Sequence, residues 1–172
     1  LQERVAFELG VKAGTWPLEI LQGVCRSGFD ALAGVYKRFD ALCGLSEKDP
    51  KVFIKAAKVI QRTANMLKGY GKTAGEPKEE LLAESQEKKI FELVRSRSQE
   101  VAELLAAGDY EKATRLFAQI FSAPLHEFFD NVLINAENPE LRENRMALVS
   151  KINRLYTGCL ADLSGLSRID EA

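Results

Sequence analysis

Apolar residues in this chain recur every three or four positions, and in no segment do they alternate regularly with polar residues at every second position. The longer spacing is typical of amphipathic α-helices, whereas strands require the two-residue alternation. Three helix starts are marked by a capping residue shortly followed by proline, at Thr15, Asp49 and Asn138. The sequence therefore predicts an all-α fold, a bundle of about eight helices. We expect them at about 1–13, 15–27, 29–42, 49–67, 78–107, 109–120, 122–133 and 138–163.

The composition is that of a soluble globular protein. Of its 172 residues, 46% are apolar and 28% are charged, and a chain of this length fits one domain. We expect a single helical domain over residues 1–172, with a flexible, glycine-rich loop at 69–77. No apolar run approaches the roughly 20 residues that span a bilayer, so we expect no membrane partner. The three widely spaced cysteines indicate a reducing cytosol, so we expect a cytoplasmic protein. Because the sequence starts at Leu1 and not at Met, we also expect it to be a fragment of a longer chain.

Charge is unevenly distributed, although the net charge is only -1. Residues 48–72 hold seven basic side chains and one acidic side chain, whereas residues 76–111 hold ten acidic and five basic ones. On the helix expected at 49–67, polar side chains fall opposite the apolar face. This basic stripe consists of Lys51, Lys55, Lys58, Arg62 and Asn65. The candidate nucleic-acid contacts are the basic stripe together with Lys68 and Lys72, and Tyr70 is a further aromatic candidate.

Three interpretations of the basic stripe stay open at this point. Lysines on the outer face of an amphipathic helix most often only face solvent. The stripe could instead pack beside the acidic helix at 78–107, which would neutralise it. In the third interpretation it contacts nucleic-acid phosphates, while aromatic, Asn or Arg side chains meet splayed bases.

No catalytic or metal site is visible in the sequence. His126 is the only histidine, so the His-Glu pair at 126–127 lacks the second imidazole of a zinc-protease motif. Residues 69–73 lack the spacing of a phosphate-binding loop. Cys25, Cys43 and Cys159 are widely spaced, which favours a reducing compartment, and each occupies an apolar helical position typical of buried structural thiols. We therefore expect no catalytic residue, metal or cofactor in this chain.

Four segments carry a resemblance to a known family. They are Phe128-Phe129-Asp130-Asn131-Val132, the run 137–148 (ENPELRENRMAL), the run 58–67 (KVIQRTANML) and the run 104–110 (LLAAGDY). Together they resemble the C-terminus of the bacterial glycyl-tRNA synthetase beta subunit, and the similarity extends from about residue 1 to residue 166. One departure is Val59, which stands where the family has a second basic residue.

The resemblance implies a helical bundle similar to the anticodon-binding domain of arginyl-tRNA synthetase. It implies a tRNA anticodon-binding module that positions glycine tRNA for aminoacylation, with glycine and ATP handled by the separate alpha subunit. The implied partners are glycine tRNA, the remainder of the beta subunit and the alpha subunit, with no DNA. An alternative is a helical docking module that binds proteins without contacting RNA. The motif residues expected to fasten the fold internally are Phe128, Phe129, Asp130, Asn144 and Arg145.

Overall fold

The computed structural model describes residues 16–28, 31–70, 75–167 and 169. Within these residues the chain forms α-helices and two short 3-10 helices, and no strand occurs there. The α-helices are α2 (Trp16–Arg26), α3 (Leu32–Lys48), α4 (Pro50–Leu67), α5 (Ser85–Ala106), α6 (Tyr110–Asn131) and α7 (Pro139–Thr157); the 3-10 helices are η1 (Glu79–Leu81) and η2 (Leu163–Gly165). The predicted all-α class is confirmed, with six α-helices in the described residues in place of about eight. The helix expected at 1–13 lies outside them.

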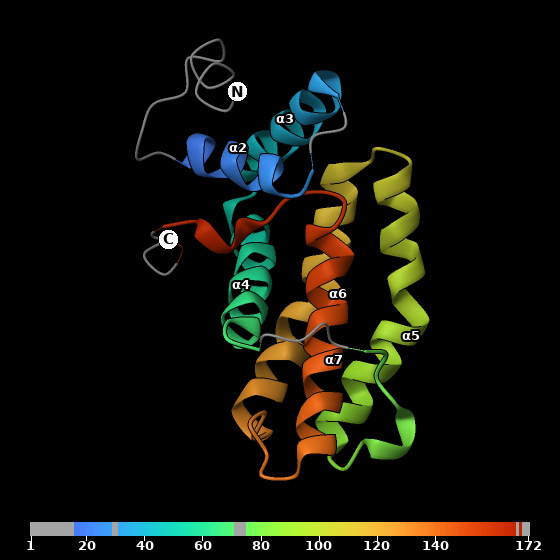
Figure 1. Cartoon of the computed structure of the whole chain (residues 1–172). Helices are drawn as coiled ribbons and strands as arrows, with labels where there is room; N and C mark the ends of the chain where they lie inside the picture. Colours follow the sequence, from blue (N-terminus) through green and yellow to red (C-terminus); the bar gives the residue numbers. More distant parts are fainter. Residues whose placement is uncertain (1–15, 29–30, 71–74, 168, 170–172) are drawn as a thin grey trace.

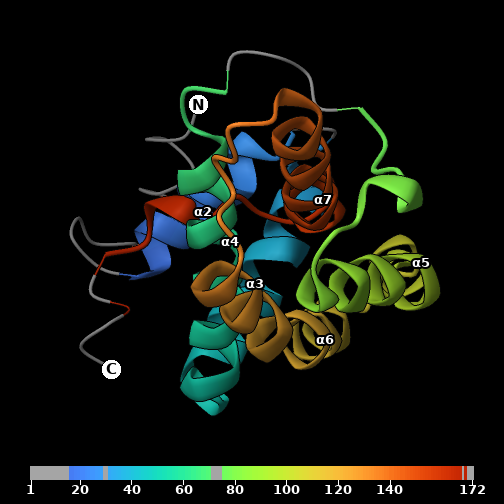
Figure 2. The ribbon, with the colours of Figure 1, turned by 90° about the horizontal axis from the view of Figure 1, so that it is seen from below.

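Helices α4, α5, α6 and α7 form a four-helix bundle (Figure 1), in which α6 and α7 each pack against both α4 and α5. Seen from below, α4 and α5 lie on opposite sides, with α6 and α7 between them (Figure 2). Helices α2 and α3 form one end of the molecule, where α3 packs against α4 and α6. The basic and acidic helices are therefore separated in space.

The core is apolar and rich in aromatic rings. Phe117 lies 4.8 Å from Tyr156 and 5.2 Å from Phe121, measured between ring centroids. The hydroxyl of Tyr156 is hydrogen-bonded to Oγ1 of Thr114 at 2.9 Å, so its one polar atom is satisfied inside the core. Burial raises the pKa of Tyr156 above its ordinary value, as expected for a neutral core hydroxyl.

The segment that follows α7 returns across α2 and α4. The backbone N–H of Asp162 donates to the carbonyl of Gly23 at 3.0 Å, and Arg26 donates to the side chain and the carbonyl of Asp162. A Cβ atom at position 23 would lie 2.5 Å from the carbonyl oxygen of Asp162, so only glycine at position 23 allows the two backbone segments to approach this closely. Residues near opposite ends of the chain are thus fastened together.

Several expected helix boundaries are wrong. The helix expected at 29–42 is α3, which extends to Lys48. The helices expected at 109–120 and 122–133 are one helix, α6, with Pro124 inside it. Proline removes one backbone hydrogen bond, but Phe121, Leu125 and Phe128 remain buried on one face, and their packing holds the helix together.

The acidic helix α5 begins at Ser85 and not near Lys78, because Glu87 accepts hydrogen bonds from the backbone N–H groups of Ala83 and Glu84 and so fixes its start. The last helix, α7, ends at Thr157, and η2 follows it.

Candidate nucleic-acid interface

Helix α4 carries the basic stripe as its sequence predicts. Asp49 caps the helix by accepting from the backbone N–H of Val52 at 3.3 Å, and Pro50 occupies the first turn. The buried face includes Phe53, Ala56, Ala57 and Ile60. On the other side Lys51, Lys55 and Asn65 are exposed, and Lys58 and Arg62 are half-buried.

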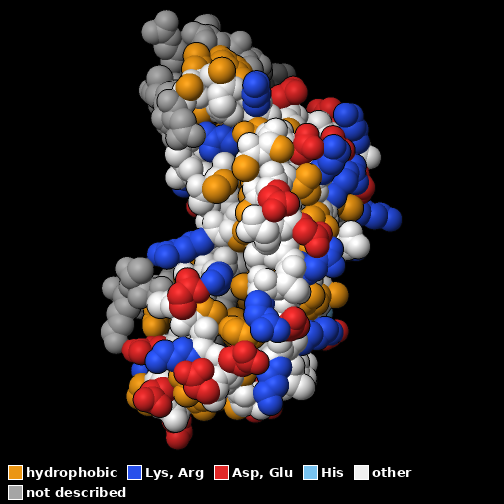
Figure 3. Space-filling view, turned by 90° about the vertical axis from the view of Figure 1, so that its right-hand side faces the viewer, with side chains coloured by type: hydrophobic (Ala, Val, Ile, Leu, Met, Phe, Trp, Pro, Cys, Tyr) orange, Lys and Arg blue, Asp and Glu red, His pale blue; other side chains and the backbone are white. Residues whose placement is uncertain are grey.

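The interpretation in which the acidic helix neutralises the stripe is wrong. Helix α5 packs against α6 and α7, on the far side of the bundle from α4 (Figure 2). Its charges are balanced locally by the pairs Glu92–Arg95 and Arg97–Glu100, and by Lys89 with Glu127 of α6. Accordingly, Figure 3 shows basic and acidic side chains interspersed over the face that includes α5.

Helix α6 holds Arg62 of the basic stripe in place. Its guanidinium donates to Nδ1 of His126 at 2.6 Å and to Oδ1 of Asp130 at 3.4 Å. It also lies 5.0 Å from the ring centroid of Phe129, within the range of a cation–π contact. Because arginine only donates, Nδ1 must be the acceptor, which leaves the proton of the neutral ring on Nε2, 3.3 Å from Asp130. The guanidinium is therefore fixed in orientation while 39% of the Arg62 side chain stays exposed.

A groove runs along α4 past Arg62, and we call it the α4 groove. It consists of three adjoining hollows: the first and second share Arg62, and the second and third share Asn65 and Met66. Their volumes are about 640, 430 and 530 Å³. The first lies between α4 and α6 at His126, the second faces the turn after α6, and the third lies between the end of α4 and α7. Further lining residues are Lys58, Gln61, Lys68, Tyr70, Phe129, Leu133, Asn135, Arg142 and Glu143.

The α4 groove combines the groups that single-stranded RNA requires. Lys58, Lys68 and Arg142 supply positive charge for phosphates. Phe129 and Tyr70 supply aromatic surface, and Asn amides supply donors and acceptors for base edges. This mixture differs from the purely apolar lining of a docking groove for a partner helix.

The predicted residues are only partly brought together. Lys58, Arg62, Asn65 and Lys68 line the groove, and Nζ of Lys68 donates to Oδ1 of Asn65 at 3.1 Å. Lys51 and Lys55 lie further toward the start of α4, outside its lining. Lys72 falls outside the described residues, as does part of the loop expected at 69–77.

The motif residues divide into two groups. Phe128, Asn144 and Arg145 are buried. Phe129, which is half-buried, and Asp130, which is exposed, both lie beside Arg62. Phe129 lines the α4 groove, and Asp130 pairs with Arg62, so the surface contacts of these two residues go beyond the internal role expected for them. Three groove residues that sequence reasoning missed are Leu133, Asn135 and Arg142. The only sequence signal for the first two is a short polar break between helices.

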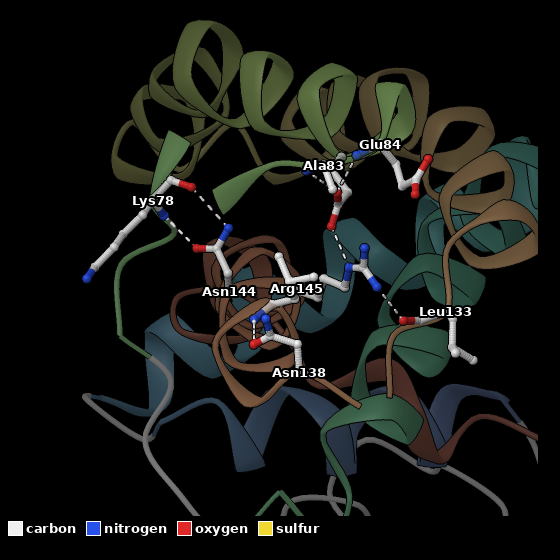
Figure 4. Close-up of polar contacts among 9 residues, drawn as sticks. Lys78, Ala83, Glu84, Leu133, Asn138, Asn144 and Arg145 are labelled. Carbon is white, nitrogen blue, oxygen red and sulfur yellow. Dashed lines mark hydrogen bonds and ion pairs between the residues drawn. The ribbon is translucent and has the colours of Figure 1, made fainter. Parts of the chain in front are cut away.

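The buried motif residues anchor the non-helical segments that border the bundle. Nε of Arg145 donates to Glu87 at 2.5 Å, and its Nη1 donates to the carbonyl of Leu133 at 2.6 Å. Asn144 forms two hydrogen bonds with the backbone of Lys78, at 2.6 and 3.0 Å. Figure 4 shows both side chains directed away from α7 toward these backbone groups. Arg145 of α7 thus fixes the turn after α6, and Asn144 fixes the segment before α5.

The described residues offer no metal cluster of His, Cys, Asp and Glu side chains. Two of the thiols, Cys25 and Cys43, are half-buried, but the expectation of a buried thiol is wrong for Cys159, which is exposed just after α7. Burial, reinforced by Glu47 and Asp40, raises the pKa of Cys43 to about 12, which keeps this thiol protonated. None of the described helices is long and apolar enough to cross a bilayer.

Residues 57–166 match the family described as the DALR anticodon binding domain. Similar proteins include three glycine–tRNA ligase beta subunits. The one from Pasteurella multocida (strain Pm70) is 35% identical over 139 residues, 80% of this chain and 19% of that protein. The one from Dichelobacter nodosus (strain VCS1703A) is 31% identical over 152 residues, 88% of this chain and 21% of that protein.

The third, from Haemophilus influenzae (strain ATCC 51907 / DSM 11121 / KW20 / Rd), is 38% identical over 106 residues, 62% of this chain and 15% of that protein. The chain therefore corresponds to about a fifth, or less, of the length of these relatives. The family match spans well over half of the chain and includes α7, most of α4 and all of α5 and α6. The chain belongs to the DALR anticodon binding domain family.

Proposed function

We propose that this chain is the tRNA anticodon-binding module of a glycine–tRNA ligase beta subunit. The observation that carries the proposal is the α4 groove, in which basic, aromatic and amide side chains meet on one face of a DALR domain. In this proposal the module grips glycine tRNA in the cytoplasm. Glycine is activated with ATP elsewhere in the enzyme, and the partners are the remainder of the beta subunit and the alpha subunit. The module itself binds no cofactor.

The exposed lysines along α4 position the RNA in this mechanism. Lys51 and Lys55 in the first half of the helix and Lys68 just after it contact phosphates, which fixes the position of the RNA without reading its sequence. The groove, which Lys68 also lines, accommodates the unpaired nucleotides of the loop. Because α4 is rigidly packed on α6 and α7, the lysines and the groove keep a constant spacing.

The alternative, a docking module that binds only proteins, has less support. Among the described residues the exposed large apolar side chains are Leu32 and Leu133, which lie on separate elements. A protein-docking face is expected to present a contiguous apolar patch of several hundred Å². Leu133 borders the α4 groove, so its exposure is compatible with RNA contact.

Salt dependence of tRNA binding tests the proposal. We expect the 172-residue chain to bind a glycine tRNA transcript with an affinity that falls steeply as salt rises, because bound phosphates release counterions. The triple variant Lys51→Gln, Lys55→Gln, Lys68→Gln removes three such contacts. The slope of log affinity against log salt should then flatten by about 2 to 3.

The matched control replaces three exposed lysines elsewhere, as Lys37→Gln, Lys88→Gln, Lys112→Gln. This control should leave the slope nearly unchanged. If both triple variants flatten the slope equally, binding is nonspecific and the α4 face has no special role. If the unmodified chain fails to bind the transcript at low salt, the proposal is wrong.

A further inference from the structure

We propose that the middle hollow of the α4 groove is a slot for one unstacked nucleobase of the bound RNA. The inference rests on the proposed function and names the chemistry of one position within it. The slot is bordered by Arg62, Asn65, Phe129, Leu133 and Asn135. Its volume of about 430 Å³ is toward the lower end of the roughly 300–1,000 Å³ typical of small-molecule sites, which suits a single base.

One wall of the slot is a stacking platform. The guanidinium of Arg62 is held by two α6 side chains and lies 5.0 Å from the ring centroid of Phe129. Arginine planes and aromatic rings are the surfaces on which proteins stack splayed RNA bases. Since the guanidinium is already oriented, little side-chain entropy is lost when a base stacks on it.

The edge of the slot carries two amides that can read a base. Asn65 and Asn135 approach it from α4 and from the turn after α6. Oδ1 of Asn65 accepts from Lys68, so the NH₂ group of that amide is the part available to donate to a base. The exposed side chain of Asn135 offers a donor and an acceptor from the other side.

The lining of the slot also includes an apolar side chain on an anchored turn. Leu133 is 71% exposed, although its backbone carbonyl accepts from Arg145 at 2.6 Å. Arg145 is itself paired with buried Glu87, so a shift of the turn would break a hydrogen bond to a guanidinium that is fixed in the core. A base stacked in the slot covers the apolar surface of Leu133 and removes it from water.

The charges along the groove fit this placement. Within the slot the positive charge of Arg62 is balanced by Asp130. The hollows on either side carry Lys58 at one end, and Lys68 and Arg142 together with the single carboxylate of Glu143 at the other. Phosphates that precede and follow the base can therefore meet positive charge, while the base itself lies at a locally neutral position.

A thermodynamic cycle between protein and RNA tests the slot. The RNA partners are the glycine tRNA transcript and versions with a single abasic nucleotide at each anticodon-loop position in turn. The protein partners are the unmodified chain and Leu133→Ala, with Leu32→Ala as a matched control that also truncates an exposed leucine. Binding is measured at one fixed salt concentration.

We expect one abasic position to weaken binding to the unmodified chain by about 5- to 150-fold, the range of base stacking on protein surfaces. At that position Leu133→Ala should cause little further loss, because the base that it contacts is already missing. At every other position the affinity losses caused by the abasic nucleotide and by Leu133→Ala should multiply. The control Leu32→Ala should leave the affinity for every RNA unchanged.

Two outcomes separate the slot from the function on which it rests. If the chain binds tRNA with a steep salt dependence but the affinity losses from Leu133→Ala and from the abasic nucleotide multiply at every position, the middle hollow does not hold a base, while the proposed function stands. If the chain does not bind the transcript at all, both are wrong. The same cycle with Asn135→Ala tests whether the Asn135 amide contacts the base. If the affinity losses of Asn135→Ala and of the abasic nucleotide multiply at every position, Asn135 does not contact the base.

Discussion

The buried pair between Glu87 and Arg145 offers the sharpest prediction about stability. Glu87 is fully buried, and only 6% of the Arg145 side chain is exposed. One carboxylate oxygen accepts from Arg145, and the other accepts from the backbone N–H groups of Ala83 and Glu84, at 2.8 and 2.6 Å. The substitution Arg145→Met keeps most of the side-chain volume and leaves a buried carboxylate without its counter-charge.

The magnitude follows from what each variant leaves unpaired. Removing one partner of a buried ion pair costs about 3–5 kcal/mol. In the double variant Glu87→Gln, Arg145→Met the remaining group is a neutral amide whose oxygen can still accept from both backbone N–H groups. The loss is then limited to the two hydrogen bonds of Arg145, about 1–3 kcal/mol together. The second substitution should therefore restore about 2 kcal/mol.

Urea unfolding followed by circular dichroism measures this difference. With a slope of about 2 kcal/mol per molar urea, the double variant should unfold at a midpoint about 1 M above that of Arg145→Met. The control Arg154→Met, at an exposed position of the same helix, should change stability by no more than about 0.5 kcal/mol. If the double variant is no more stable than Arg145→Met, the unpaired charge is not the cause of the loss.

Two further predictions concern backbone packing and acid stability. Gly23→Ala places a Cβ 2.5 Å from the carbonyl oxygen of Asp162 and should lower the free energy of unfolding by about 1–3 kcal/mol. In Gly44→Ala the added Cβ meets nothing within 4 Å, so this helical substitution should raise the free energy of unfolding by about 0.5–1 kcal/mol. Equal effects of the two variants in urea unfolding would refute the packing argument. The hydrogen bond from Arg115, together with that from the Val52 N–H, holds the pKa of Asp49 below its ordinary 3.8. The ionised carboxylate of Asp49 therefore stabilises the fold above pH 3.8, and this stabilisation is lost as the pH falls through the lowered pKa. The Tm difference between the unmodified chain and Asp49→Asn, which keeps the cap, should therefore shrink as the pH falls from about 7 to below 3.8, and a constant difference would contradict this.

Local signals predicted α4 well. Its start is set by the Asp49 side chain and Pro50, and its buried face follows the helical period, so both could be read without tertiary information. The boundaries that failed depend on distant partners. Pro124 is a strong local stop signal, but the core contacts of the residues around it keep α6 continuous.

The candidate site was only half visible in the sequence for the same reason. Periodicity tells which residues share one face of α4, but it does not tell which neighbour that face approaches. The contacts of Arg62 with His126 and Phe129 join residues more than sixty positions apart, and they exist only because α4 packs on α6 and not on α5. Leu133 and Asn135 are groove residues because Arg145 anchors their turn, a link with no local signature.

The central claim is that the anticodon loop of tRNA lies in the α4 groove, and site-directed photo-crosslinking tests it most directly. A photoreactive benzophenone side chain is placed at position 133, beside the groove, or at position 32, the other exposed leucine. We predict that crosslinks from position 133 to glycine tRNA map to the anticodon loop, and that position 32 gives few or none there. Crosslinks from position 133 that map to the acceptor arm, or loop crosslinks of equal yield from position 32, would contradict the claim.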